Sequence, residues 1–448
     1  MDQGVRRWGR GAWGAAGLVL TLACGQPPPG GRDVAQMPHS LPDALRASAG
    51  AAPPAALPSD AETAAEQACL AVGTVHLALS LLQVLDGGPS HNILFSPYSL
   101  TRALGLLQMG ARGRTAEQLA HALHVPNTGP RLAPAYGAAQ AALSAEAQRS
   151  RAHTQLVQAD AVWGAPWVSP ETPFLSAVAA GFTDAWHTVD FAETSSLARD
   201  TINRWVCEQT GGHIHDLFAQ DAPSVHTHLL LINTLFVSAP WAKAFNPKFV
   251  KDAPFYNADA SVAFVPTMVQ QIKGQLAQAC GYIALDVPYR AAGLSLTLVM
   301  PQPGQNAVIE ELTADCLEAL WAHMQPEVVD LSLPKFKVEA SFGVKDALMA
   351  VGVQDVFMPE QADLGGIDGH ATSLYVDEVV HRATLEVNEK GTLASAATGI
   401  LLRTTAVAEH TEHIHVDRPF LFFMRDRQAG TLLFAGKVST LGSPPLSP

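Results

Sequence analysis

The sequence has 448 residues, of which 48% are hydrophobic and 15% are charged, and its formal net charge is -13. This length and apolar content suffice for one large folded domain or two ordinary ones. The acidic balance argues against a nucleic-acid or heparin-type partner, because binding phosphate or sulfate groups requires a basic patch.

Residues 1–24 are typical of an export signal. Three arginines precede the apolar run 11–23, which is too short to span a bilayer easily. The run ends at Cys24 in a segment similar to the lipobox of bacterial lipoproteins, except that Thr21 stands where leucine is usual. We therefore predict export, with either a lipid on Cys24 or an ordinary secretory signal in which this cysteine is incidental. The three arginines are Arg6, Arg7 and Arg10.

The segment after the signal has the composition of a disordered tether. Residues 25–60 hold eight of the 31 prolines, with Gly, Ala and Ser between them. Neither a second linker nor an internal repeat follows before residue 442. We therefore predict a linker at 25–61, a single domain at 62–442 and a tail at 443–448. The cysteines after Cys24 include no CxxC pair, so we expect no zinc ribbon, and their sequence positions assign no disulfide.

Predicted helices dominate the first half of this domain, and predicted strands dominate the second. Apolar spacing and end signals predict helices at 64–85, at 115–124 with Thr115 as N-cap, and at 201–210 ending at Gly211. Apolar or alternating runs predict strands at 228–237, 294–300, 327–338 and 373–387. Helices followed by long strands indicate an α+β fold.

The segment 386–399 is the most informative part of the chain and reads EVNEKGTLASAATG. It begins as a strand, and its bulky residues then give way mostly to Gly, Thr, Ala and Ser. Such small residues bury little apolar area and do not hold a strand well on their own. They are suited to entering a sheet as a new strand between two existing strands, where larger side chains would clash.

With this segment and a series of motifs in order, residues 66–440 resemble the serpin family. The residues that carry the resemblance are 92–100 (NILFSPYSL), 110–115 (GARGRT), Asn203, Trp205 and Val206, 210–214 (TGGHI), 233–236 (NTLF), Pro240, Trp241 and Phe245, 333–336 (LPKF), 379–383 (VVHRA), 416–423 (VDRPFLFF) and 430–438 (GTLLFAGKV). The resemblance implies the α+β serpin fold, in which about nine helices pack around three β-sheets. One of these is a large central mixed sheet, and a reactive-centre loop is exposed.

The resemblance also implies two sites in the central sheet. The shutter, where the sheet parts, would contain Ser96, Ser99, Asn233 and His381. These polar groups can hydrogen-bond in both the closed and the opened sheet. The alternative is that they are satisfied buried polar groups with no switching role. The breach, where insertion begins, would contain Trp241, Lys335 and Glu389, with the last two forming an ion pair.

The inferred function is inhibition of a serine-type endopeptidase as a suicide substrate. The protease would attack the loop and form an acyl-enzyme, and the cut loop would insert as a strand and displace the protease from deacylation geometry. The hinge residues are Glu389, Gly391, Thr392, Ala394, Ser395, Ala396, Ala397 and Thr398. About 14 inserted residues would extend ~46 Å. Leu393 departs from the family, which often has glutamate there.

The family distance from Gly391 places the scissile bond at Thr405–Ala406. A small β-branched residue suits the shallow pocket of an elastase-like or subtilisin-like protease. A shorter hinge would place the bond after Thr404 or after Arg403, and Arg403 would favour a trypsin-like target with an acidic pocket. The implied partner is a serine protease. The protein is expected to be a secreted monomer that needs no cofactor and contacts a membrane only through a lipid on Cys24.

Two functions other than inhibition have sequence signatures that can be checked, and so does heparin binding. A hydrolase is not expected, because the chain has neither a Gly-x-Ser-x-Gly elbow nor a His-Glu-x-x-His motif. A serpin that is a carrier, chaperone or plain substrate remains the alternative, although its hinge would normally carry bulky, charged or proline residues. The segment 131–157 offers only three arginines, so we expect no heparin acceleration. They are Arg131, Arg149 and Arg151.

A histidine-rich segment follows the predicted bond and has the residue types of a zinc site. His410, His413 and His415 stand near Glu409 and Glu412, a spacing that could serve a metal ion in a turn. In an extended segment, however, these side chains would not all point the same way. We therefore predict a solvated polar segment and no metal site.

Overall fold

The computed structural model describes residues 59–442 except for several short gaps and a longer one at 393–411. The short gaps are 86–87, 89, 127–128, 150–153, 193–194, 219–222, 292, 304–310 and 371–373. The predicted signal with Cys24, most of the linker and the tail lie outside the described residues. The first described helix, α2 (Asp60–Val84), is capped by Ser59, and Glu62 completes a capping box with it.

The described residues form two hydrogen-bonded sheets, and we call the six-stranded one sheet A. Its order is β10 (Phe336–Gly343), β11 (Val376–Asn388), β12 (Gly391–Thr392), β4 (Leu229–Pro240), β2 (Gln155–Gly164) and β3 (Trp186–Thr188). Every residue of β4 is buried, as its apolar run predicts for a central strand. β4 pairs antiparallel with β2 and parallel with β11, so sheet A is mixed.

The second sheet has nine strands and is connected through one long strand, β6 (Val262–Ala279). The path runs β1 (Ile93–Phe95), β15 (Leu432–Val438), β14 (Phe420–Asp426), β8 (Leu294–Pro301), β7 (Tyr282–Pro288), β6, β9 (Gln325–Pro334) and β13 (Glu412–His415), with β5 (Lys251–Tyr256) paired to β6. One part of β6 pairs with β5 and another with β7. Two of the three expected sheets are therefore joined by hydrogen bonds along β6.

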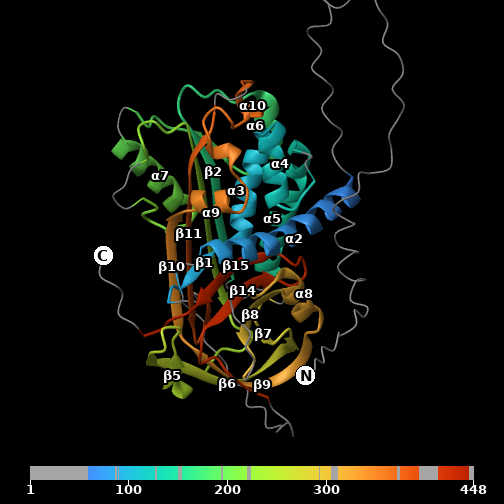
Figure 1. Cartoon of the computed structure of the whole chain (residues 1–448), viewed down its shortest axis with the longest axis vertical. Helices are drawn as coiled ribbons and strands as arrows, with labels where there is room; N and C mark the ends of the chain where they lie inside the picture. Colours follow the sequence, from blue (N-terminus) through green and yellow to red (C-terminus); the bar gives the residue numbers. More distant parts are fainter. Residues whose placement is uncertain are drawn as a thin grey trace, which may run out of the picture.

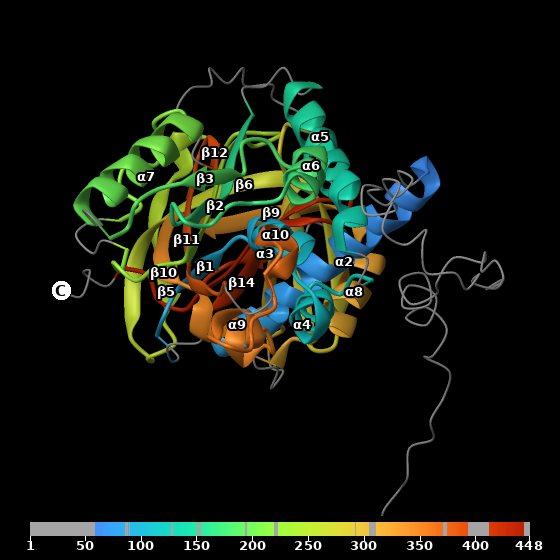
Figure 2. The same ribbon diagram turned by 90° about the horizontal axis from the view of Figure 1, so that it is seen from above.

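Nine α-helices occur in the described part of the chain. After α2 they are α3 (Pro97–Gly110), α4 (Gly113–Ala122), α5 (Ala133–Arg149), α6 (Thr172–Gly181), α7 (Ser195–Gln209), α8 (Ala314–Ala322), α9 (Lys345–Ala350) and α10 (Gly365–Asp368). Figures 1 and 2 show α7 on one side of sheet A, with α2, α3 and α4 on the other. Every residue of α3 is buried, so this helix forms the centre of the core.

Most predicted elements are present, but helix α7 begins at Ser195, before its predicted start at 201. Two further differences concern a strand and a helix cap. The predicted strand 327–338 is divided at Lys335 into β9 and β10, which belong to different sheets. Thr115 is not an N-cap, because α4 begins two residues earlier at Gly113. Its hydroxyl instead accepts a hydrogen bond from the backbone N–H of Asp363 at 3.0 Å. A tertiary contact thus uses the side chain that the local sequence pattern assigned to the helix end.

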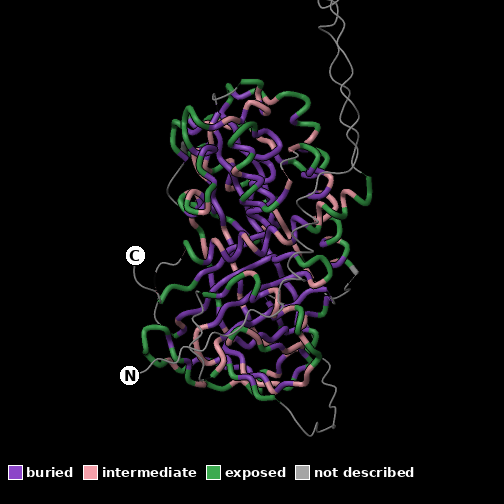
Figure 3. The backbone as a smooth tube through the Cα atoms, turned by 45° about the vertical axis from the view of Figure 1, so that its right-hand side comes forward, coloured by how far each residue is buried: buried purple, intermediate pink, exposed green. Residues whose placement is uncertain are grey.

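Buried residues extend along the whole molecule between its two ends (Figure 3). α2 is the one helix in the described residues that is long and apolar enough to cross a membrane. However, 61% of its most apolar window is buried, as in a core helix. The larger core cluster surrounds α2 and α3, and the second lies between sheet A and the nine-stranded sheet around Trp241.

Candidate functional site

The predicted hinge begins inside sheet A as a tight hairpin between β11 and β12. Asn388 pairs with Gly391, and Val387 pairs with Thr392. Gly391 has φ 153°, and a Cβ at this position would lie 2.1 Å from the carbonyl oxygen of Ala239. Only glycine combines this backbone conformation with such a close approach, so the sequence at the turn fixes where the chain reverses.

Thr392 is already a strand residue of sheet A. It is fully buried and pairs antiparallel with Ala239 of β4, while its other edge pairs with β11. Its hydroxyl lies 2.5 Å from the hydroxyl of Tyr289, which follows β7 in the other sheet. Burial raises the pKa of Tyr289, so this phenol stays protonated and can hydrogen-bond to Thr392. The small polar side chain of the hinge thus has a matching partner inside the molecule.

Trp241 closes the end of sheet A at this hairpin. Its ring stacks on Tyr289 with centroids 4.6 Å apart and planes 7° apart. Its indole N–H donates to the carbonyl oxygen of Asn388 at 2.9 Å, and its backbone N–H donates to that of Lys390 at 3.0 Å. The predicted breach residue therefore binds the backbone both at the end of β11 and within the turn.

The predicted ion pair at the root of the loop is present. Lys335 Nζ lies 3.0 Å from Glu389 Oε1, with side-chain exposures of 37% and 18%. Burial raises the pKa of the Glu389 carboxyl, but hydrogen bonding to its own backbone N–H and to Lys335 outweighs burial and leaves the pKa lowered. A partly exposed pair of this kind contributes ~1 kcal/mol or less to stability.

The structure brings the four predicted shutter residues together, all fully buried. His381 of β11 accepts the backbone N–H of Ser96 at 3.0 Å, and its Nδ1 lies 2.9 Å from Asn233 Oδ1. Asn233 donates to the carbonyl oxygen of Ser99 at 2.5 Å. Burial lowers the pKa of His381 to about 3, so the imidazole is neutral and can donate from one nitrogen while it accepts on the other.

A buried ion pair that the sequence analysis missed adjoins the shutter. Arg102 Nε of α3 lies 2.8 Å from Asp160 Oδ2 of β2, with side-chain exposures of 3% and 4%. The second carboxylate oxygen of Asp160 accepts from Asn233 at 2.6 Å, and Gln158 also donates to this side chain. Burial raises the pKa of Asp160, whereas the adjacent guanidinium opposes that rise. The two charges lie on a helix and a strand that are remote in sequence, so no local pattern indicates them.

Sheet A is closed along most of the seam between β4 and β11. Parallel pairing runs from Val376 opposite Leu229 to Ala383 opposite Leu235. Beyond this seam, β12 takes the place between the two strands at Ala239 and Pro240. The hinge therefore begins to occupy the position between β4 and β11 at one end of the sheet.

The remaining loop predictions lie outside the described residues. They are the hinge positions Ala394, Ser395, Ala396, Ala397 and Thr398 and the candidate bond residues Arg403, Thr404, Thr405 and Ala406.

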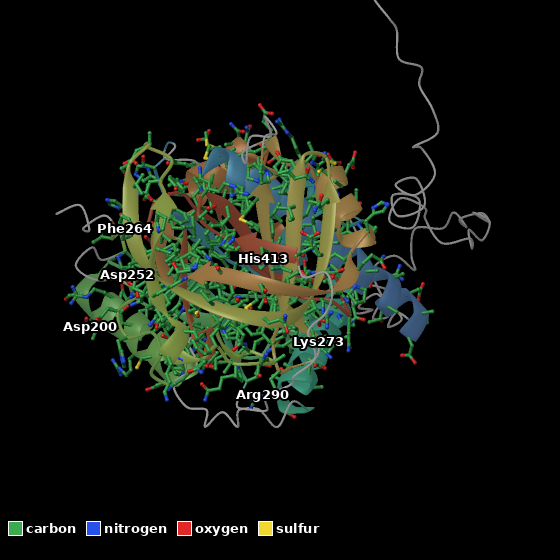
Figure 4. The ribbon with its side chains drawn as sticks, turned by 90° about the horizontal axis from the view of Figure 1, so that it is seen from below. Asp200, Asp252, Phe264, Lys273, Arg290 and His413 are labelled. Carbon is green, nitrogen blue, oxygen red and sulfur yellow. The ribbon has the colours of Figure 1, made fainter. Side chains whose placement is uncertain are left out.

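The histidine-rich segment resumes as strand β13. Figure 4 labels His413, which lies opposite Asp330 of β9 in the parallel pairing of β13 with β9. Its Nδ1 is 3.6 Å from an Asp330 oxygen, and both side chains are partly or largely exposed. The described residues contain no group of three metal-binding side chains. Glu409 and His410 lie outside those residues, so this result concerns only the part of the segment in β13.

Comparisons with known proteins agree with this geometry. The model of the family "Serpin (serine protease inhibitor)" matches residues 73–441. The leukocyte elastase inhibitor of Bos taurus is 32% identical over 389 residues, covering 83% of this chain and 99% of the relative. An uncharacterized serpin-like protein of Thermococcus kodakarensis is 31% identical over 354 residues, covering 78% and 81%.

Solved structures show the same fold. Native protease nexin-1 with heparin superposes with a TM-score of 0.71 at 26% identity, covering 83% of this chain and all of that one. Maspin superposes with a TM-score of 0.74 at 22% identity, covering 84% and 100%. The architecture predicted from the motifs is thus confirmed, and the chain is not an enzyme but a member of the serpin family.

Proposed function

We propose that this serpin is an inhibitor of serine-type endopeptidases that acts as a suicide substrate. The observation that carries the proposal is the position of Thr392, which is buried between β11 and β4 and pairs with both. A strand that has already entered at one end can be extended by the small residues that follow it once the loop is cut. The seam ahead of it consists of a single set of β4–β11 bonds.

The inferred reaction uses the loop as bait. The nucleophile of the protease attacks the scissile carbonyl, the peptide bond breaks, and an acyl-enzyme forms. Insertion then adds strand hydrogen bonds on both edges of the loop and moves the protease away. The displaced protease loses the oxyanion-hole geometry that deacylation requires. The shutter groups support this step, because neutral His381 and Asn233 can exchange partners without leaving a buried charge.

For the target, we propose an elastase-like protease cleaving at Thr405–Ala406. The relatives named leukocyte elastase inhibitor support this class, and a small residue at the bond suits a shallow specificity pocket. Subtilisin-like and trypsin-like proteases are the alternatives, the latter with cleavage after Arg403. We also propose export of the protein, as its first 24 residues suggest, with Cys24 either as a lipid attachment site or as an incidental residue of an ordinary secretory signal.

The direct test is incubation with elastase, subtilisin and trypsin at equal molar ratio, followed by a denaturing gel. A band at the summed mass that survives boiling in SDS would reveal the trapped acyl-enzyme. Mass spectrometry of the released C-terminal fragment would identify the bond.

The alternative is a serpin that does not inhibit and serves as a carrier, a chaperone or a plain substrate. Loop cleavage by all three proteases without a stable complex would favour it. Thermal unfolding of the cleaved protein separates the two further, because an inserting loop raises the melting temperature strongly and a non-inserting one does not.

A further inference from the structure

A pocket of about 490 Å³ lies at the end of sheet A opposite β12. Four strand ends build it: the residues after β2 (165–167), those after β3 (190–192), those before β4 (225–228), and Tyr375 just before β11. This end of the sheet is the one nearest α6 and α10 in Figure 1. The pocket thus stands where a strand inserted between β4 and β11 would finish.

The pocket walls combine aromatic rings with an acidic group. The ring of His228 lies edge-on to Trp167, with centroids 4.8 Å apart, and 4.5 Å from the ring of Tyr375. Asp190 lies in the wall, where its carboxylate accepts the backbone N–H of Ala192 at 2.8 Å. The lining residues include neither lysine nor arginine, so the site favours a cation that can also stack on rings.

Two contacts at this pocket also hold the seam shut. The rings of His228 and Tyr375 touch across it, from the start of β4 to the start of β11. Asp377 Oδ2 of β11 accepts the backbone N–H groups of His228 at 2.7 Å and Leu229 at 3.3 Å. A new strand would part β4 and β11 by roughly 4.8 Å and break both contacts. The Asp377 carboxylate would then need a new partner, because an unpaired, partly buried charge is costly.

The register of β12 identifies the residue that would arrive there. Thr392 lies opposite Ala239, and the pairing is antiparallel. Ten residues further along, Leu402 would therefore lie opposite Leu229, the first residue of β4. The next residue, Arg403, would reach the pocket beside His228. Alternation along the strands also puts the Arg403 and His228 side chains on the same face.

We propose that this pocket is the receiving site for the Arg403 guanidinium in the cleaved, inserted protein, an inference that rests on the proposed function. The planar cation would stack against Trp167 and Tyr375 and pair with the carboxylates of Asp190 and Asp377. Arg403 remains on the inserted fragment for each of the three candidate bonds. The pocket therefore anchors the far end of the new strand whichever bond the protease cuts.

The test uses the intact protein and a synthetic peptide with the sequence of residues 392–405. Thermal unfolding at increasing peptide concentration reports insertion as a rise in melting temperature. We expect the R403Q peptide to need an about tenfold higher concentration for half-saturation. An A397Q peptide is changed on the same face but away from the pocket. It should reach half-saturation at nearly the same concentration as the natural peptide.

Protein variants locate the effect in the pocket. In the D190N/D377N protein, the difference between the natural and R403Q peptides should disappear, whereas it should persist in D200N, whose side chain is exposed on α7 (Figure 4). Equal binding of the two peptides to the unmodified protein would overturn the pocket assignment and leave the proposed function standing. Failure of every peptide to raise the melting temperature would count against loop insertion itself.

Discussion

The hydroxyl of Thr392 lies 2.5 Å from the hydroxyl of Tyr289, and this contact links β12 of sheet A to the residue that follows β7 of the nine-stranded sheet. Both side chains are buried, and Tyr289 is also stacked on Trp241. Thr392 therefore occupies a site shaped for a small hydroxyl-bearing side chain. Side chains that are large or charged do not fit that site.

The first prediction concerns this position. T392R would place a charge where the natural side chain has no exposed surface, and burying an unpaired charge costs several kcal/mol. We expect the variant to be cleaved by the target protease without forming the SDS-stable complex, and its melting temperature to stay unchanged after cleavage. L393E is the matched control, since the neighbouring residue would face solvent after insertion, and it should still form the complex. A trapped complex with T392R would contradict the insertion pathway.

The second prediction concerns pH. Burial lowers the pKa of His381 to about 3, against 6.5 for an ordinary histidine, and burial with His76 and His121 nearby lowers that of His124 to about 4. Between pH 4 and pH 6.5 the unfolded chain therefore binds more protons than the folded chain. The free energy of unfolding should be highest above pH 6.5 and decrease as pH falls toward 4. Each proton contributes about 1.4 kcal/mol per pH unit.

Urea unfolding between pH 7.5 and 5 would measure this slope, in a range where most carboxylates are still ionised. The H124A variant should show a shallower slope, because one of the two histidines no longer titrates. A free energy of unfolding that does not change with pH over this range would show that neither imidazole is held neutral.

The third prediction concerns the buried pair of Arg102 and Asp160. R102M removes the guanidinium and leaves a buried carboxylate with amide partners alone, so we expect a loss of about 3–5 kcal/mol. The double variant R102M/D160N removes both charges and should recover much of that loss. Equilibrium unfolding of the two variants in urea tests this. Equal destabilisation by the single and double changes would mean that the charge is not the cause.

The fourth prediction concerns thiol reactivity. Burial, together with a hydrogen bond to Cys280, raises the pKa of Cys316 to about 12, and this side chain is 7% exposed. Because the thiolate is the reactive form, Cys316 should react with iodoacetamide at pH 8 more slowly than exposed Cys280. Peptide mass spectrometry over a time course would rank the two sites. Faster modification of Cys316 would contradict its placement.

The sequence predicted the elements whose signals are local. The apolar run of β4, the glycine end of helix α7, and the Trp241 and His381 motifs appear where the patterns place them, whereas α7 begins earlier than predicted, at Ser195. Thr115 shows the limit of such patterns, since its hydroxyl is used by a residue far along the chain. The fold class needed only local signals and motif order.

The polar contacts of the site could not be predicted from the sequence, because they too join residues that are far apart along the chain. Arg102 and Asp160 become partners only when α3 packs against β2, and Tyr289 meets Thr392 only when the two sheets stack. A single charged or aromatic residue in a sequence could contact many different partners in the folded chain, and the sequence alone does not distinguish them. The pocket at the far end of sheet A is likewise assembled from four separate strand ends.

The short strand β12 would give the proposed insertion a fixed starting point and direction. Since Gly391 reverses the chain against Ala239, the residues after Thr392 would enter in order on that mechanism, each displacing the next bond of the β4–β11 seam. On the proposed mechanism, the outcome would depend on two competing rates, the rate of stepwise strand insertion and the rate of acyl-bond hydrolysis. A change that strengthens the seam would lower only the insertion rate, so the protein would be cleaved as a substrate more often and would trap the protease less often.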